Sequence, residues 1–396
     1  MTTSDDTNIM DTWLVENDHK VRVNLGESNV SDLRLCDVLP RADDQNWLHD
    51  LTLGNNSTWG SLKLRQAVAD TYPGISSTNV LVTAGVSEAV VVACLTHYEP
   101  GANFIIPVPA FHSLFDVPEK LGYEIRKISL RQESEFRLCT DSIIEAIDAK
   151  TRIILLNSPH NPTGIVYSHD DIAKIARAAN EVGALVIVDE HYRYLPYDAS
   201  REWTESSALT QENIVTLGSV GKCFGCTGIR VGWIIASDKL LDRYHHHKLL
   251  VTHTIPVISD RIAAELLIRR RDFLPRTRAE IAQNIQRLNI AASRSDGAIR
   301  LHVPDAGSIA FVELRDVKNT LAFTQKLLDE FGILVLPGES FDSPGFIRLR
   351  LGISPTAFDE ACDRIQALLE RDKPNRKGAA ADGADLHDRM IKAIVT

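Results

Sequence analysis

The chain has 396 residues, of which 44% are hydrophobic and 24% are charged, a composition typical of a globular protein with a large core. Its 43 Lys and Arg against 53 Asp and Glu give a formal net charge of −10, which argues against a surface built for nucleic acid or anionic lipid. The acidic N-terminus, the short apolar runs and the six cysteines do not fit a signal peptide, a membrane span or a disulfide scaffold. We therefore expect a cytoplasmic protein that binds neither membrane nor nucleic acid.

Short apolar runs alternate with helix-like segments through the middle of the chain. The expected strands are 79–83, 104–107, 152–156, 184–189, 214–219 and 231–236. A helix is expected at 171–182, where apolar residues recur at helical spacing. This alternation predicts an α/β fold, a mostly parallel sheet sandwiched between helices.

The pattern changes after about residue 270. A charged helix is expected at 277–293, followed by strands at 308–314 and 347–352. Ser354 and Pro355 then form the N-cap and first residue of a helix with one apolar stripe, made of Phe358, Cys362, Ile365 and Leu369. This part of the chain predicts a smaller α+β domain.

Polar segments follow the expected strands at their carboxyl ends, where open α/β sheets bind ligands. The first strand turns at Gly85 into a helix, so the amides of Val86 and Ser87 could hold a phosphate, although a plain turn also favours glycine there. Residues 157–164, Asn-Ser-Pro-His-Asn-Pro-Thr-Gly, form a rigid loop that leaves the Asn161 amide free to donate to a ligand.

Two further segments carry charged side chains. Asp189 ends a buried strand and needs a cationic partner, such as a protonated heteroaromatic nitrogen, unless it caps a helix. Tyr192 could donate to an oxygen on the same ring. Lys222 lies in a glycine-rich loop between Ser219 and Arg230, where an amine of lowered pKa could attack a carbonyl, although such residues are commonly surface groups.

The order and spacing of these segments, over roughly residues 20–370, resemble the fold-type-I pyridoxal-phosphate (PLP) enzymes, specifically the class I/II aminotransferase superfamily. Residues 157–164 are similar to its NPxNPTG loop, 189–192 to its D-x-x-Y, 219–222 to its S-x-x-K and 228–232 to its G-x-R-x-G. Residues 60–65 are similar to its G-x-x-x-L-R.

The resemblance implies PLP as cofactor and gives these residues roles. Lys222 would bind the cofactor as a Schiff base and move protons at the substrate Cα, and Asp189 would keep the pyridine nitrogen protonated. The other implied cofactor contacts are Asn161 and Tyr192 on the phenolic oxygen, Phe111 on the ring face, and Val86, Ser87, Ser219 and Arg230 at the phosphate.

The resemblance also implies an amino-acid substrate and a homodimer with active sites at the interface. Arg348 would bind the α-carboxylate, with Asn161 and Gly26 beside it. The implied division is an N-terminal arm and part of the small domain (1–49), a large PLP-binding domain (50–270), a small C-terminal domain (271–370) and a solvated tail (371–396).

The chain departs from the family pattern at Asn55, where many members have a tyrosine, and at Gly221, where Ser or Ala is common. Asn55, the N-terminal stretch and residues 109–114 resemble the capreomycidine-synthase branch, which cyclises a hydroxylated arginine in antibiotic biosynthesis. Three outcomes stay open: this cyclisation, transfer of the amino group to a 2-oxo acid, or PLP binding without catalysis.

Two substrate contacts are hypotheses. Glu27 would bind a guanidinium, or else be an exposed surface residue, and His112 would be a proton shuttle, or else a structural histidine. Cys223 and Cys226 lack a second pair for zinc, and His245 to His247 are adjacent on an expected helix, so we expect no metal. No basic DNA-binding head precedes the resemblance, which argues against a regulator.

Overall fold

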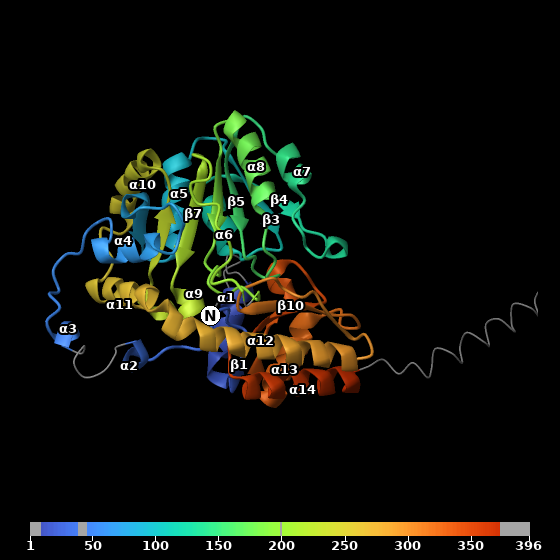
Figure 1. Cartoon of the computed structure of the whole chain (residues 1–396). Helices are drawn as coiled ribbons and strands as arrows, with labels where there is room; N and C mark the ends of the chain where they lie inside the picture. Colours follow the sequence, from blue (N-terminus) through green and yellow to red (C-terminus); the bar gives the residue numbers. More distant parts are fainter. Residues whose placement is uncertain (1–8, 39–45, 199, 373–396) are drawn as a thin grey trace, which may run out of the picture.

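A seven-stranded sheet forms the upper part of the molecule in Figure 1. The computed structural model describes residues 9–38, 46–198 and 200–372. In spatial order the strands are β2 (Val80–Thr83), β8 (Gly232–Ile235), β7 (Ile214–Ser219), β6 (Leu185–Asp189), β5 (Thr151–Asn157), β3 (Asn103–Val108) and β4 (Glu124–Ser129). The antiparallel pairs all involve β8, so the expected mostly parallel sheet is confirmed.

Helices cover both faces of this sheet (Figure 1). Along β5, Ile153 and Leu155 pack into one apolar cluster while Ile154 and Leu156 pack into another, because successive strand residues point to opposite faces. The helices that contribute to these faces are α4 (Leu62–Ala69), α5 (Val86–His97), α6 (Ser113–Lys120), α7 (Thr140–Glu145), α8 (His169–Glu181) and α10 (Asp238–Val251). Burial on both faces explains why the central strands are apolar throughout.

The lower part of Figure 1 is built from a second, antiparallel sheet and three long helices. Its strands run β12 (Leu336–Pro337), β13 (Phe346–Arg350), β10 (Ile309–Leu314) and β9 (Ile299–Leu301). The helices are α12 (Arg270–Arg294), α13 (Thr320–Phe331) and α14 (Pro355–Arg371). The N-terminal strand β1 (Val23–Asn24) pairs with β11 (Ile333–Leu334), so a segment from the N-terminal part of the chain joins the C-terminal part here.

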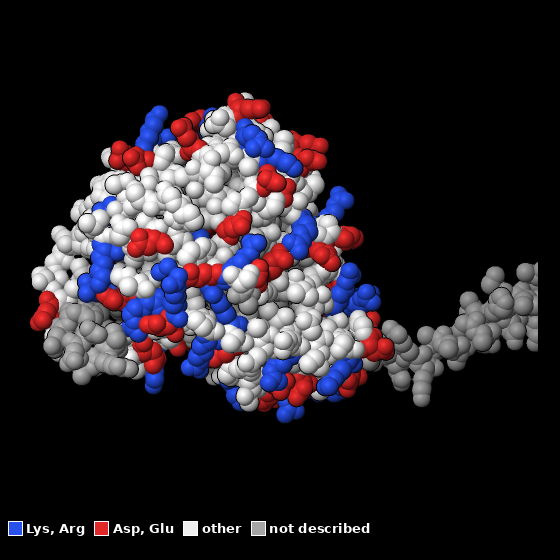
Figure 2. Space-filling view, viewed as in Figure 1, with Lys and Arg blue, Asp and Glu red and all other residues white. Residues whose placement is uncertain are grey.

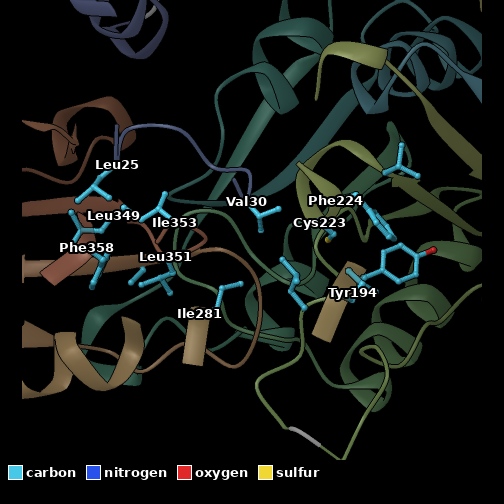
Figure 3. Packing of buried hydrophobic residues seen from close by; sticks show 14 of the residues in the cluster. Leu25, Val30, Tyr194, Cys223, Phe224, Ile281, Leu349, Leu351, Ile353 and Phe358 are labelled. Carbon is cyan, nitrogen blue, oxygen red and sulfur yellow. The ribbon is translucent and has the colours of Figure 1, made fainter. Parts of the chain in front are cut away.

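The N-terminal segment after β1 connects the two parts. Figure 3 shows Leu25 beside Leu349 of β13, and Val30 between Leu349 and the residues Cys223 and Phe224. The amide of Val30 donates to the carbonyl of Lys222 at 3.0 Å. This segment is therefore held against the loop that carries Lys222, which forms α9 (Gly221–Phe224).

The shorter elements complete the chain. They are α1 (Ile9–Asn17), α2 (Leu35–Val38), α3 (Asn46–His49), α11 (Val257–Ile268) and the 3-10 turns η1 (Asp18–Lys20), η2 (Ser77–Asn79), η3 (Gln132–Ser134), η4 (Thr227–Ile229) and η5 (Gly338–Phe341). No helix in the described ranges is long and apolar enough to cross a membrane.

The expected elements agree with the structure to within a few residues, except at the start of one helix, and several short or peripheral elements were not expected. Strand β4 is one of these, because only Ile125 and Ile128 within Glu124–Ser129 are apolar and they pack on opposite faces of the sheet edge. Helix α12 begins at Arg270, seven residues before the expected start, with Pro275 inside it. Most of the expected tail at 371–396 lies outside the described residues, and Arg371 is the last residue of α14.

Candidate active site

A cavity of about 700 Å³, partly open to solvent, lies at the carboxyl ends of β5, β6 and β7. All predicted cofactor contacts except Tyr192 line it: Val86, Ser87, Phe111, Asn161, Asp189, Ser219, Lys222 and Arg230. They come from five separate stretches of sequence. Because parallel strands end at the same edge of the sheet, the fold brings these stretches together.

One end of the cavity is suited to an anion. Gly85 precedes α5 with a φ of +90°, and a Cβ atom built there would lie 2.8 Å from the Arg230 guanidinium. A side chain at this position would therefore occupy the space between the helix N-terminus and Arg230. The backbone N–H groups of a helix N-terminus and a guanidinium both favour a phosphate.

Lys222 is part of the same cavity lining. Its Nζ donates to Ser28 Oγ at 2.8 Å. Burial lowers the pKa of Lys222 to about 8; Glu27 acts in the opposite direction, and Arg348 and Arg230 lower the pKa further. A substantial fraction of this amine is therefore neutral, and able to act as a nucleophile or base, slightly above neutral pH.

Asp189 lies at the end of β6 and is 1% exposed. The Nδ1 atom of His191 lies 2.9 and 2.8 Å from its two carboxylate oxygens, and Asn157 Nδ2 lies 3.4 Å from Oδ2. No helix begins in residues 190–198, which follow Asp189 directly, so the alternative interpretation of Asp189 as a helix cap is wrong. A buried carboxylate beside the cavity suits a cationic ring nitrogen.

Tyr192 and Arg348 are buried and are not themselves part of the cavity lining. The Tyr192 hydroxyl has no well-formed hydrogen bond to any described residue; burial raises its pKa, and Arg348 and Ser28 act in the opposite direction. Arg348 is 2% exposed and donates to Asn161 Oδ1 at 3.1 Å and to the Gly26 carbonyl. Its Nε has no partner, and burial lowers its pKa to about 10.

Neither predicted side-chain contact of the substrate, Glu27 or His112, is part of the cavity lining. The Glu27 carboxylate opposes part of the lowering of the pKa values of Lys222, Arg348 and Arg350, and its neighbours Gly26 and Ser28 contact Arg348 and Lys222. His112 does not line the cavity, because its ring nitrogens face Asp116 at 2.7 Å and Asp11 at 3.3 Å. The structure therefore does not bring His112 into the position that a proton shuttle requires.

Residues that the sequence analysis did not single out also line the cavity. Ser28 and His191 make the contacts with Lys222 and Asp189 described above. His191 stands inside the D-x-x-Y segment, so its position next to Asp189 was a usable signal. Ser28 is 194 residues from Lys222, and nothing local to either residue predicts their contact. The thiols of Cys223 and Cys226 each contact a backbone carbonyl.

These groups fit PLP. The cofactor has a phosphate, a protonated ring nitrogen, a phenolic oxygen and an aldehyde, and the site offers a helix N-terminus with Arg230, the carboxylate of Asp189, the unpaired Tyr192 hydroxyl and the Lys222 amine. The fold and the site together define a PLP-dependent enzyme of fold type I.

The chain belongs to the family of class I and II aminotransferases, whose model matches residues 21–365. It is 25% identical to aromatic-amino-acid aminotransferase 2 of Thermococcus litoralis, covering 79% of this chain and 83% of that protein. It is 26% identical to capreomycidine synthase of Streptomyces vinaceus, covering 87% of this chain and 88% of the synthase. A PLP-dependent aminotransferase of Streptococcus suis has the same fold, with a TM-score of 0.86 and 24% identity over 92% of this chain and 98% of that chain.

Proposed function

We propose that this enzyme acts at Cα and Cβ of an L-amino acid with a cationic side chain, and that it cyclises a hydroxylated L-arginine to a cyclic guanidino amino acid in specialised metabolism. The observation that carries the proposal is the place of Glu27 in the chain, between Gly26, whose carbonyl accepts from Arg348, and Ser28, whose hydroxyl accepts from Lys222 at 2.8 Å. An amino acid bound by Arg348 through its carboxylate would have an acidic partner for a guanidinium nearby.

The predicted cofactor contacts are proposed to hold PLP. The N-terminus of α5, Ser219 and Arg230 would bind its phosphate, Asp189 its ring nitrogen, and Asn161 and Tyr192 its phenolic oxygen, with Phe111 against the ring. PLP supplies an electron sink for the negative charge that develops at the substrate Cα.

Lys222 is the proposed base. With a pKa of about 8, its neutral amine takes the proton from the substrate Cα and returns it later in the reaction. Ser28 Oγ, 2.8 Å from Nζ, fixes the direction of the amine. Arg348 binds the α-carboxylate and so presents Cα to Lys222, using donors that include its unpaired Nε.

The overall reaction needs no second substrate. The Cα–H bond breaks and forms again, the Cβ–O bond and one guanidine N–H bond break, a bond forms from Cβ to that nitrogen, and one water is released. An aminotransferase, by contrast, needs a 2-oxo acid to accept the amino group. This alternative is favoured by the names of relatives such as the Thermococcus litoralis aminotransferase, and PLP binding without catalysis is the third possibility.

A product screen tests the proposal. The purified protein is incubated with PLP and β-hydroxy-L-arginine, L-arginine or common L-amino acids, with and without a 2-oxo acid. The masses of the products are then measured by mass spectrometry. We expect loss of water from hydroxyarginine without an oxo acid, with all nitrogens retained. Exchange of the amino group only with an oxo acid would establish the aminotransferase instead, and no product from any substrate would favour the non-catalytic alternative.

Glu27→Gln tests the guanidinium contact within the same screen. We expect the KM for hydroxyarginine to rise about tenfold, because a charge-assisted hydrogen bond is lost, and the KM for a neutral amino acid to change little. An unchanged KM for the cationic substrate would remove Glu27 from this role.

A cytoplasmic homodimer is also proposed. The six free cysteines, of which Cys36 and Cys139 are exposed, suit a reducing compartment. Exposed apolar residues that line one shallow hollow with Asn55 support self-association.

A further inference from the structure

His191 lines the cavity and contacts Asp189, one of the predicted cofactor residues. The proposed function gives His191 no role. Its side chain is largely buried, and its Nδ1 lies 2.9 Å from Asp189 Oδ1 and 2.8 Å from Oδ2. Its own backbone N–H adds a 3.3 Å contact to Oδ1. A carboxylate only accepts hydrogen bonds, so Nδ1 carries a proton and donates it.

The other support for the Asp189 side chain is weaker. Asn157 Nδ2 lies 3.4 Å from Oδ2, at the long end of hydrogen-bond distances, and its 3.0 Å bond goes to the Asp189 backbone carbonyl instead. The imidazole is therefore the principal side-chain contact that fixes the rotation of this carboxylate.

The imidazole is itself held in place. The carbonyl of His191 accepts from Cys223 Sγ at 3.2 Å, next to Lys222, and its ring packs on Tyr192 with centroids 4.0 Å apart. His191 thus lies between the carboxylate proposed to bind the cofactor ring and the segment that carries the lysine.

We propose that His191 is a positioning residue that holds the Asp189 carboxylate in the direction required by the cofactor's ring nitrogen. This inference rests on the proposed role of Asp189. A carboxylate that is already fixed before the cofactor arrives loses less rotational freedom when the cofactor binds. The protein should therefore bind the cofactor more tightly.

Asparagine and leucine at position 191 separate this role from simple packing. The Asn side-chain nitrogen is bonded to Cγ, as Nδ1 is in histidine, so His191→Asn retains a donor at nearly the same place. Leucine has a similar size to asparagine and has no donor. His302→Leu, at a buried histidine just after β9, is the control for loss of an imidazole elsewhere.

The measurement is the dissociation constant of PLP from each apo-protein, followed by tryptophan fluorescence, with thermal unfolding of the apo-proteins to check their folding. We expect His191→Leu to weaken PLP binding about tenfold, and His191→Asn and His302→Leu to change it less than threefold. Equal weakening in His191→Asn and His191→Leu, or no weakening in either, would overturn the inference.

Asp189→Asn keeps this failure distinguishable from a failure of the proposed function. If Asp189→Asn binds PLP as tightly as the wild type, the proposed role of Asp189 is wrong. If Asp189→Asn weakens binding and His191→Leu does not, only the inference about His191 is wrong.

Discussion

Lys222 shows how the surroundings of a single residue set its chemistry. Its pKa falls to about 8, chiefly because of burial, and Glu27 opposes part of this effect. A lysine in water has a pKa near 10.4 and is almost fully protonated at pH 7. The site therefore contains an amine that can react with a carbonyl under ordinary conditions.

This electrostatic balance predicts the pH dependence of PLP binding. The rate at which PLP combines with the apo-protein should rise with pH, with its midpoint at about pH 8, where half of Lys222 has lost its proton. In Glu27→Gln the pKa of Lys222 loses a raising influence, so the midpoint should fall. Stopped-flow absorbance over pH 6–10 measures both curves.

Glu370→Gln is the matched control, since Glu370 is exposed on α14 and contacts Gln366. Its midpoint should equal that of the wild type. A midpoint near 10.4 in the wild type, or no difference in Glu27→Gln, would contradict this account of Lys222.

The residues of the site were predictable to different degrees. Asp189 and Lys222 stand in local motifs, and the cavity collects both. The fixed spacing of a motif does not predict where a flexible ring points, so His112 was expected near the substrate although Asp11 and Asp116 hold it elsewhere. Ser28 could not be predicted, because its contact with Lys222 depends on how the N-terminal segment packs.

At the scale of elements, the N-terminal segment and the loop of α9 form one structural unit. Leu33 N–H donates to the Gly225 carbonyl at 2.8 Å, and Val30 N–H donates to the Lys222 carbonyl. Gly225 has a φ of +62°, and a Cβ atom there would lie 1.9 Å from the Ser31 carbonyl oxygen. Any side chain at Gly225 therefore pushes the two segments apart.

Gly225→Ala should lower the free energy of unfolding by about 2–4 kcal/mol, because it combines a left-handed backbone with a steric clash. Gly228→Ala, three residues away with no atoms within 4 Å of its added Cβ, should change it by less than about 1 kcal/mol. Urea unfolding of both variants checks this. Equal stability of the two variants would show that the contact with Ser31 does not constrain the fold.

The sequence predicts the interior elements better than the peripheral ones. Strands β5, β6 and β7 are buried along their whole length, so unbroken apolar runs mark them. Strand β4 has only two apolar residues, three positions apart, at an edge of the sheet, and the proline in α12 hides the first turns of that helix. The pairing of β1 with β11 joins residues about 310 positions apart and has no local signal.

At the scale of the whole molecule, charge and exposed apolar surface have different meanings. On the face shown in Figure 2, positive and negative side chains are interspersed, so the net charge of −10 does not describe a site where Lys222, Arg230 and Arg348 gather.

We propose that residues 50–270 form the large domain and residues 271–370 the small domain, with part of 1–49 joining the small domain through β1.

The proposed homodimer gives a test at the same scale. Leu53 is 76% exposed and Ile258 is 40% exposed, and both line one shallow hollow with Asn55. Exposed apolar residues that share a hollow mark an association surface. Leu53→Asp should therefore shift the protein from dimer to monomer in sedimentation velocity at micromolar concentrations.

Ile290→Asp, at a residue that is 49% exposed on α12, is the control and should remain dimeric. A wild-type monomer, or a Leu53→Asp dimer as stable as the wild type, would contradict the proposed interface.

The proposed site requires that Lys222 carry the cofactor. Reduction of the PLP-loaded protein with borohydride, followed by mass spectrometry of its peptides, tests this directly. We expect a pyridoxyl-phosphate group on the peptide that contains Lys222, and none after Lys222→Ala. Modification of another lysine, or an unmodified Lys222 peptide from a protein loaded with PLP, would contradict it.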